Sequence, residues 1–146
     1  MAKQFKSIKE AVSYIKSAQR RSSREIGLEV EKVMKETTQK NLYDAYSPEE
    51  YERTYDMINM IGITESSVDS VTVAFQDKGG HTSWNDPKPH VYVAPILEEG
   101  GHTWERDGGR KAPTNIVEDS YEIARDTVPE TYIKSMAVSG IKVKKR

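Results

Sequence analysis

The 146-residue sequence contains no cysteine, which excludes disulfide bonds and thiolate metal sites. It has no apolar run near the roughly 20 residues that a membrane-spanning helix needs, and its first residues lack the apolar stretch of a secretory signal. Its 22 Lys and Arg against 23 Asp and Glu give a net charge of −1, so no overall field draws the chain to DNA or to a membrane. Tryptophan and phenylalanine are scarce, at two each, whereas eight tyrosines suit half-buried protein interfaces.

The length and composition are those of one ordinary domain. Hydrophobic residues make up 36% of the chain and charged residues 31%, which is enough for one modest core and a well-solvated surface. No stretch rich in Gly, Ser or Pro divides the sequence. We therefore expect a single domain spanning residues 1–146.

A short helix is predicted near the N-terminus. Ser7 with Glu10 forms a capping-box pattern, and Arg20-Arg21-Ser22-Ser23 interrupts the helical spacing that follows. We therefore predict a separate N-terminal helical segment within residues 1–22. Its apolar face comprises Ile8, Ala11, Val12, Ile15, Ala18 and Gln19.

A longer helix is predicted next. Ser22 with Glu25 offers a second capping box, and the helical pattern runs to about Asn41. Gly27 inside it indicates a tolerated glycine, a kink, or close packing against another backbone. The helix has a thin apolar stripe, which we expect to cover a sheet: Ile26, Val30, Val33, Met34 and Thr37.

The centre of the chain favours a small antiparallel sheet. Residues 57–61 are apolar but ambiguous between helix and strand, and Gly62 is predicted to end them. Val71, Val73 and Phe75 alternate with smaller or polar residues, which predicts a strand. Residues 90–94 predict a second strand, and we expect the two to pair around a long loop.

The C-terminal third predicts helices and a basic end. Thr114 is expected to cap a helix, Pro129 to break it, and Gly140 to close a last helix. Residues 138–146 are predicted to form a basic C-terminal tail, in which Ile141 and Val143 could form a final edge strand before Lys144-Lys145-Arg146. The face of the first of these helices carries Ile116, Val117, Ser120, Tyr121, Ile123, Ala124 and Thr127. The whole order predicts an α+β fold: a long N-terminal helix on a small antiparallel β-sheet, with a C-terminal helix.

A repeated loop motif is the strongest candidate for chemistry. Gly-Gly-His-Thr occurs at 79–82 and again at 100–103. On one interpretation, His81 and His102 ligate zinc or iron together with His90 or a nearby carboxylate. On the other, Gly-Gly supplies loop conformations and the histidines are loop content. No tight ligand spacing supports a metal, so we expect no metal site and no cofactor.

Catalytic motifs are missing from the sequence. There is no cysteine nucleophile, Gly-x-Ser-x-Gly elbow, phosphate loop or dinucleotide fingerprint. The adjacent acids Glu98 and Glu99 point in different directions and favour a solvated turn. We expect no catalytic residue and no enzyme activity.

Two long loops and the basic end favour binding to partners. Residues 76–89 and 99–113 exceed ordinary hairpin connections, and each contains a tryptophan that either folds back on the domain or docks on a neighbour. The short basic clusters at 20–21 and 142–146 leave open a nucleic-acid-binding module. The candidate partner contacts are Trp84, Trp104, Tyr46, Tyr51, Lys144, Lys145 and Arg146.

Over residues 23–126 the chain resembles the tail-completion, or head–tail joining, proteins of long-tailed bacteriophages. Residues 51–57, Tyr-Glu-Arg-Thr-Tyr-Asp-Met, are similar to the Arg-Thr motif of that family, although Tyr55 replaces the commoner glycine. Residues 90–100 are similar to its Tyr-Ala-x-x-x-Glu-x-Gly motif, with Glu98 and Gly100 at matching places. The usual Arg-Pro-Phe-Leu entry to the last helix is replaced by residues 110–114.

The resemblance implies a structural protein of the virion neck, made in the cytoplasm of the host bacterium. Such a subunit would form a ring, expected to be hexameric, without cofactor or catalysis. Its partners would be connector or stopper proteins on the head side and the tail terminator or tail tube on the other, with genome DNA passing through the lumen. A small metal-dependent enzyme and a nucleic-acid-binding module are the alternatives.

Overall fold

A computed structural model of the chain describes residues 3–45, 56–76 and 114–145. In these residues a long helix, α1 (Ile8–Thr38), continues into a π-helical turn, Gln39–Tyr43. After the first gap come a short helix, α2 (Asp56–Met60), and two strands, β1 (Ile61–Ser66) and β2 (Val71–Phe75).

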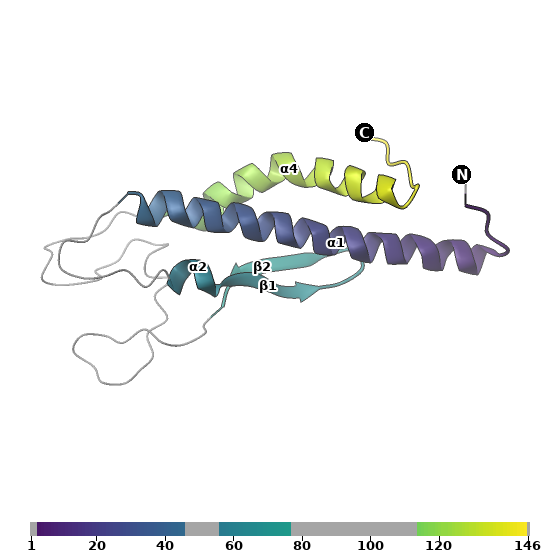
Figure 1. The fold of residues 1–146 in the computed structure, drawn as a ribbon, viewed down its shortest axis with the longest axis horizontal. Helices are drawn as coiled ribbons and strands as arrows, with labels where there is room; N and C mark the ends of the chain where they lie inside the picture. The colour runs from purple at the N-terminus through teal and green to yellow at the C-terminus, as the bar shows by residue number, and fades with distance from the viewer. Residues whose placement is uncertain (1–2, 46–55, 77–113, 146) are drawn as a thin grey trace, which may run out of the picture.

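The last described element is the helix α4 (Ile116–Val138). It packs along one side of α1, whereas α2 and the two strands pack along the other (Figure 1). A long N-terminal helix on a small antiparallel sheet, with a C-terminal helix, confirms the predicted α+β fold.

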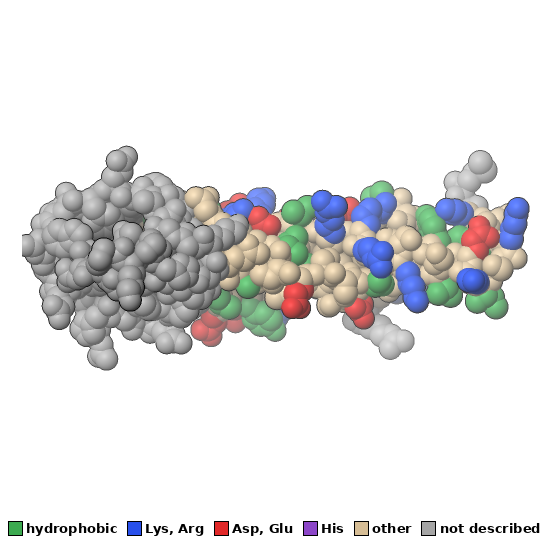
Figure 2. Space-filling view, turned by 90° about the horizontal axis from the view of Figure 1, so that it is seen from below, with side chains coloured by type: hydrophobic (Ala, Val, Ile, Leu, Met, Phe, Trp, Pro, Cys, Tyr) green, Lys and Arg blue, Asp and Glu red, His purple; other side chains and the backbone are tan. Residues whose placement is uncertain are grey.

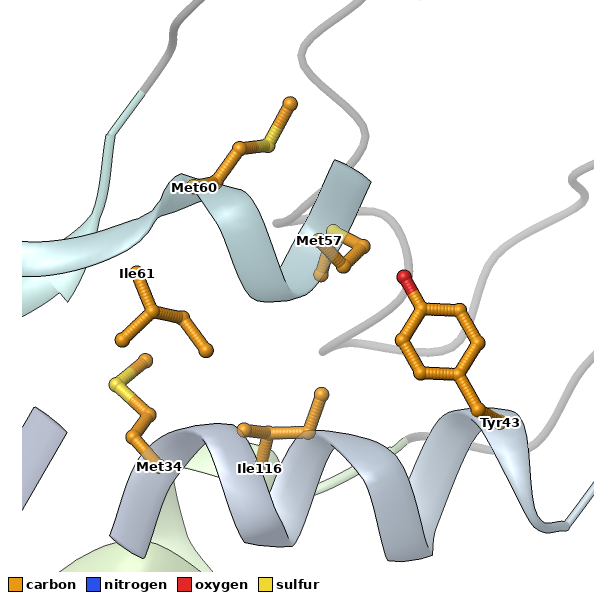
Figure 3. Packing of buried hydrophobic residues seen from close by; sticks show 6 residues of the cluster. All are labelled: Met34, Tyr43, Met57, Met60, Ile61 and Ile116. Atoms are coloured by element: carbon orange, nitrogen blue, oxygen red, sulfur yellow. The ribbon is translucent and has the colours of Figure 1, made fainter. Parts of the chain in front are cut away.

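The core lies where the C-terminal half of α1 meets α2, β1 and the start of α4. Figure 3 shows Met34 and Ile116 facing Met57 and Ile61, with Tyr43 beside them. Ile116 is fully buried. Burying apolar side chains of this size is worth about 1.5–3 kcal/mol each, so this end of α1 is the firmly held one.

The predicted interruption of the N-terminal helix at residues 20–23 is wrong, because α1 runs unbroken through them. Ser22 and Ser23 are buried, and their hydroxyls find partners on other elements. Ser22 donates to the Ser135 hydroxyl at 3.0 Å, and Ser23 donates to the Val68 carbonyl at 3.0 Å. Serine is a poor helix former because its hydroxyl competes for the backbone, and here that hydroxyl is engaged elsewhere.

Gly27 allows the sheet to approach α1. A Cβ atom at this position would lie 2.6 Å from Val71 Cγ2 and 2.8 Å from Ile63 Cδ1. The glycine therefore does not mark a kink, and it is not merely tolerated, because a larger side chain would collide with the sheet. Of the three interpretations of Gly27, close packing is right, but the neighbours are side chains of the sheet and not another backbone.

The sheet is a hairpin of β1 and β2, with Ile63 opposite Val73 and an irregularity between Ile63 and Glu65. The strand predicted at 71–75 is confirmed. The prediction that Gly62 ends its segment is wrong, because α2 passes directly into β1 and Gly62 lies inside the strand. The predicted pairing with residues 90–94 falls outside the described residues, as do the two long loops.

The C-terminal helix differs from the prediction at both its start and its middle. It begins one residue after Asn115, which adopts the left-handed conformation, so Thr114 is not its cap. Pro129 does not break it, because buried residues on both sides, Ser120 and Ser135 among them, hold α4 against α1. A proline inside a helix removes one backbone hydrogen bond, and α4 is visibly bowed in Figure 1.

The helix end at Gly140 is confirmed. Gly140 has a φ of 72°, and the amides of Gly140 and Ile141 donate to the carbonyls of Ala137 and Met136 at 2.8 and 3.1 Å. This is the hydrogen-bond pattern of a Schellman motif. The predicted strand at 141–143 is wrong, because those residues continue as irregular backbone with no strand beside them in the described sheet.

Candidate assembly interface

The N-terminal end of α1 extends past both layers that cover the rest of the helix (Figure 1). On one side, α4 reaches as far as Tyr14, whose hydroxyl donates to the Ser139 carbonyl at 2.8 Å. On the other side, the tip of the hairpin reaches Ser23 through the Val68 carbonyl. The first turns of α1 therefore form an arm that leaves the body of the subunit.

The arm carries an uncovered apolar row. Ile8, Val12 and Ile15 lie on one face at helical spacing, and all three are exposed, Ile8 by 85%. Of the predicted apolar face, Ala18 is buried against the body of the subunit, whereas Ile8, Val12 and Ile15 remain exposed. The sequence signal that this face stays open was the presence of Lys9 and Lys16 beside the row.

The arm is a well-formed helix and not a frayed end. The Ser7 hydroxyl accepts a hydrogen bond from the Glu10 amide at 3.2 Å, and the Glu10 carboxylate accepts one from the Lys6 amide at 2.9 Å. The rings of Phe5 and Tyr14 lie 5.3 Å apart between centroids. These contacts confirm the predicted cap at Ser7 and stabilise the first turn of the arm.

The fold brings the two short basic clusters of the sequence to the same end. Arg21 Nη2 donates to the Ser135 carbonyl at 3.0 Å and to the Ser139 hydroxyl at 2.6 Å, where α4 ends. The basic tail begins there, and both chain termini lie at this end in Figure 1. On the face shown in Figure 2, Lys and Arg side chains gather over the same end of the molecule.

The outer face of α4 has the opposite charge. Tyr121 is 66% exposed, and Val117 and Ile123 are about half exposed. The predicted face of this helix is therefore only partly right, because its N-terminal half buries Ile116, Ser120 and Ala124 and leaves Val117, Tyr121 and Ile123 exposed. The acidic residues around them, all exposed, are Glu118, Asp119, Glu122, Asp126 and Glu130.

Of the predicted partner contacts, the structure describes Lys144 and Lys145, and both are exposed at the basic end. The other five contacts lie outside the described residues: Trp84, Trp104, Tyr46, Tyr51 and Arg146. The three histidines and the Glu98–Glu99 pair also lie outside them. Within the described ranges, no group of three His, Cys, Asp or Glu residues is placed to hold a metal ion.

Comparison with known proteins gives one match. The family model YomN matches residues 5–142, which is nearly the whole chain and includes both the arm and α4. No helix in the described parts of the chain is long and apolar enough to cross a bilayer. No curated protein and no solved structure matches the chain. The family name is a phage-derived one and points to a phage-associated protein. The chain therefore belongs to the YomN family.

Proposed function

We propose that this chain is a structural assembly protein of the virion that forms a ring at the neck of a long-tailed phage. The ring would join the head connector to the tail and so complete the tail. Connector or stopper proteins would contact it on the head side, and the tail terminator or tail tube on the other. It would be made in the host cytoplasm, incorporated into the virion, and would need no cofactor and no catalysis.

The observation that carries this proposal is the arm of α1. A helix that keeps its form beyond its own domain, with Ile8, Val12 and Ile15 exposed in one row, is suited to insertion against another subunit. Apolar rows of this kind gain stability only when a partner removes them from water. The phage-derived family name supports placing that partner in a virion.

The test is the oligomeric state of the full chain, alone and co-expressed with the products of neighbouring genes. Light scattering should detect species larger than the 16.6 kDa monomer, and negative-stain electron microscopy should show rings. A protein that stays monomeric in every such mixture would refute the assembly proposal.

A second candidate, nucleic-acid binding, is favoured by one observation: the convergence of residues 20–21 with the basic tail at one end of the molecule. Binding through phosphates weakens steeply as salt rises. If this candidate holds, duplex DNA should bind with a steep salt slope that flattens when Lys142, Lys144 and Lys145 are changed to Ala. A ring with DNA in its lumen needs no such affinity.

A further inference from the structure

Although the chain is nearly neutral overall, its positive and negative charges are concentrated in different segments. Residues 3–24 contain seven Lys or Arg and a single acid, Glu10. Residues 116–130 of α4 contain five Asp or Glu and a single base, Arg125. We call residues 3–20 the basic arm, and the outer surface of residues 117–126 the acidic face.

Each of these two surfaces has an apolar row flanked mainly by charges of one sign, although on the acidic face Arg125 lies 3.9 Å from Glu122. In the basic arm, Ile8 and Val12 are four residues apart, and Lys9 and Lys16 are exposed on the same helix. In the acidic face, Val117 and Tyr121 are likewise four residues apart, with Glu118 and Glu122 beside them. Two helices with such rows can pack along each other, so that the apolar rows meet and the flanking charges pair.

The two surfaces cannot meet within one molecule. The start of α4 is held at the far end of α1, where Asn41 Nδ2 donates to the Thr114 carbonyl at 2.8 Å and to Asp119 at 2.7 Å. At a rise of 1.5 Å per helical residue, Val12 lies roughly 40 Å from Asn41 along α1. The basic arm and the acidic face therefore belong to opposite ends of the subunit.

We infer that the basic arm of one copy docks on the acidic face of the next copy of the same chain. The contact is heterologous, because two different surfaces of the same protein meet. An open row of subunits would end in one unpaired basic arm and one unpaired acidic face. Further subunits can therefore add to the row until the rotation between neighbouring subunits closes it into a ring. This inference rests on the proposed function in taking a second copy as the partner, and adds which surfaces meet.

Charge complementarity favours a second copy of the same chain as the partner of the basic arm. A partner for the basic arm must be acidic and must offer an apolar row to a helix, and a partner for the acidic face must have the converse. The chain itself supplies both surfaces. A nucleic acid would satisfy the lysines of the basic arm but would leave Ile8 and Val12 without an apolar partner.

The test uses charge reversal on each surface of the full-length chain. Lys9→Glu/Lys16→Glu and Glu118→Lys/Glu122→Lys are made separately, under the conditions in which the wild type assembles. Each variant alone should self-associate at least tenfold more weakly than the wild type. A control for the first of these variants, Lys32→Glu/Lys134→Glu, makes the same change of net charge as Lys9→Glu/Lys16→Glu at exposed positions outside both surfaces and should assemble normally.

The decisive measurement is an equimolar mixture of the two reversed variants. In an alternating arrangement every contact is complementary again, so assembly should return in the mixture while each component alone stays dissociated. An unfolded variant could not be rescued in this way. Normal assembly of both reversed variants alone, or no rescue in the mixture, would overturn this interface and leave ring formation standing. Failure of the wild type itself to assemble would remove the proposed function too.

Discussion

Ser22 on α1 donates a buried hydrogen bond of 3.0 Å to the hydroxyl of Ser135 on α4. The contact joins residues 113 positions apart, between the two long helices. Arg21 reaches the carbonyl of the same Ser135 from the solvent side. This pair fixes the lengthwise position of α4 along α1, and with it the distance between the basic arm and the acidic face.

Ser22→Ala should destabilise the protein by about 1–3 kcal/mol, because it leaves the Ser135 hydroxyl buried without its partner. The double variant Ser22→Ala/Ser135→Ala should lose less than the sum of the two single changes, since it removes both hydroxyls. Urea unfolding of all four proteins gives the coupling energy. Strictly additive losses would show that the two hydroxyls do not interact.

Gly27→Ala should destabilise the protein by about 1–3 kcal/mol, although alanine is the better helix former. The added Cβ would be too close to the stiff Val71 side chain, at 2.6 Å from Cγ2. Gly62→Ala is the control, because the nearest atoms to its Cβ would be those of the Gln76 side chain, at an ordinary 3.6 Å. Adding Val71→Ala to Gly27→Ala should recover part of the loss in thermal unfolding. An unchanged melting temperature for Gly27→Ala would contradict the close approach.

Ser7→Ala should loosen the basic arm without unfolding the domain. Loss of an N-cap costs about 0.5–2 kcal/mol, and here it removes the acceptor for the Glu10 amide. Hydrogen exchange should therefore speed up over residues 8–12 and stay unchanged around Ser22. Ser13→Ala, an exposed change on the same helix outside the cap, should not speed exchange there. Equal exchange in both variants would mean that the cap does not hold the arm.

Gly140→Ala should lower stability by roughly 1–2 kcal/mol, because its φ of 72° lies in the left-handed region that a Cβ disfavours. Apart from the neighbouring residues in the chain, an added Cβ would meet no atom within 4 Å, so the loss should come from backbone strain and not from a clash. Gly140→Asn should cost less, since asparagine adopts this conformation more readily. Equal thermal unfolding of the Ala and Asn variants would indicate that the turn rearranges.

Local signals in the sequence were enough to predict several features of the fold. The cap at Ser7, the strand at 71–75 and the helix end at Gly140 each depend on residues close to one another in the chain. The same kind of signal misplaced helix ends at Ser22 and Pro129, because their surroundings come from distant segments. Ser22 donates its hydrogen bond to a residue of α4. The helix continues through Pro129 because residues on both sides of the proline are buried.

For the candidate interface, the sequence alone determined that Ile8, Val12 and Ile15 share a face and that Lys144 and Lys145 belong to a basic end. Only the tertiary structure decided that this face is bare, because periodicity tells which side of a helix is apolar but not how far the neighbouring layers extend along it. Among the described residues, the hairpin reaches to Ser23 and α4 to Tyr14, so Ile8 and Val12 lie beyond both layers. The separation of the two charged surfaces follows from the antiparallel packing of α1 and α4, which long-range contacts impose.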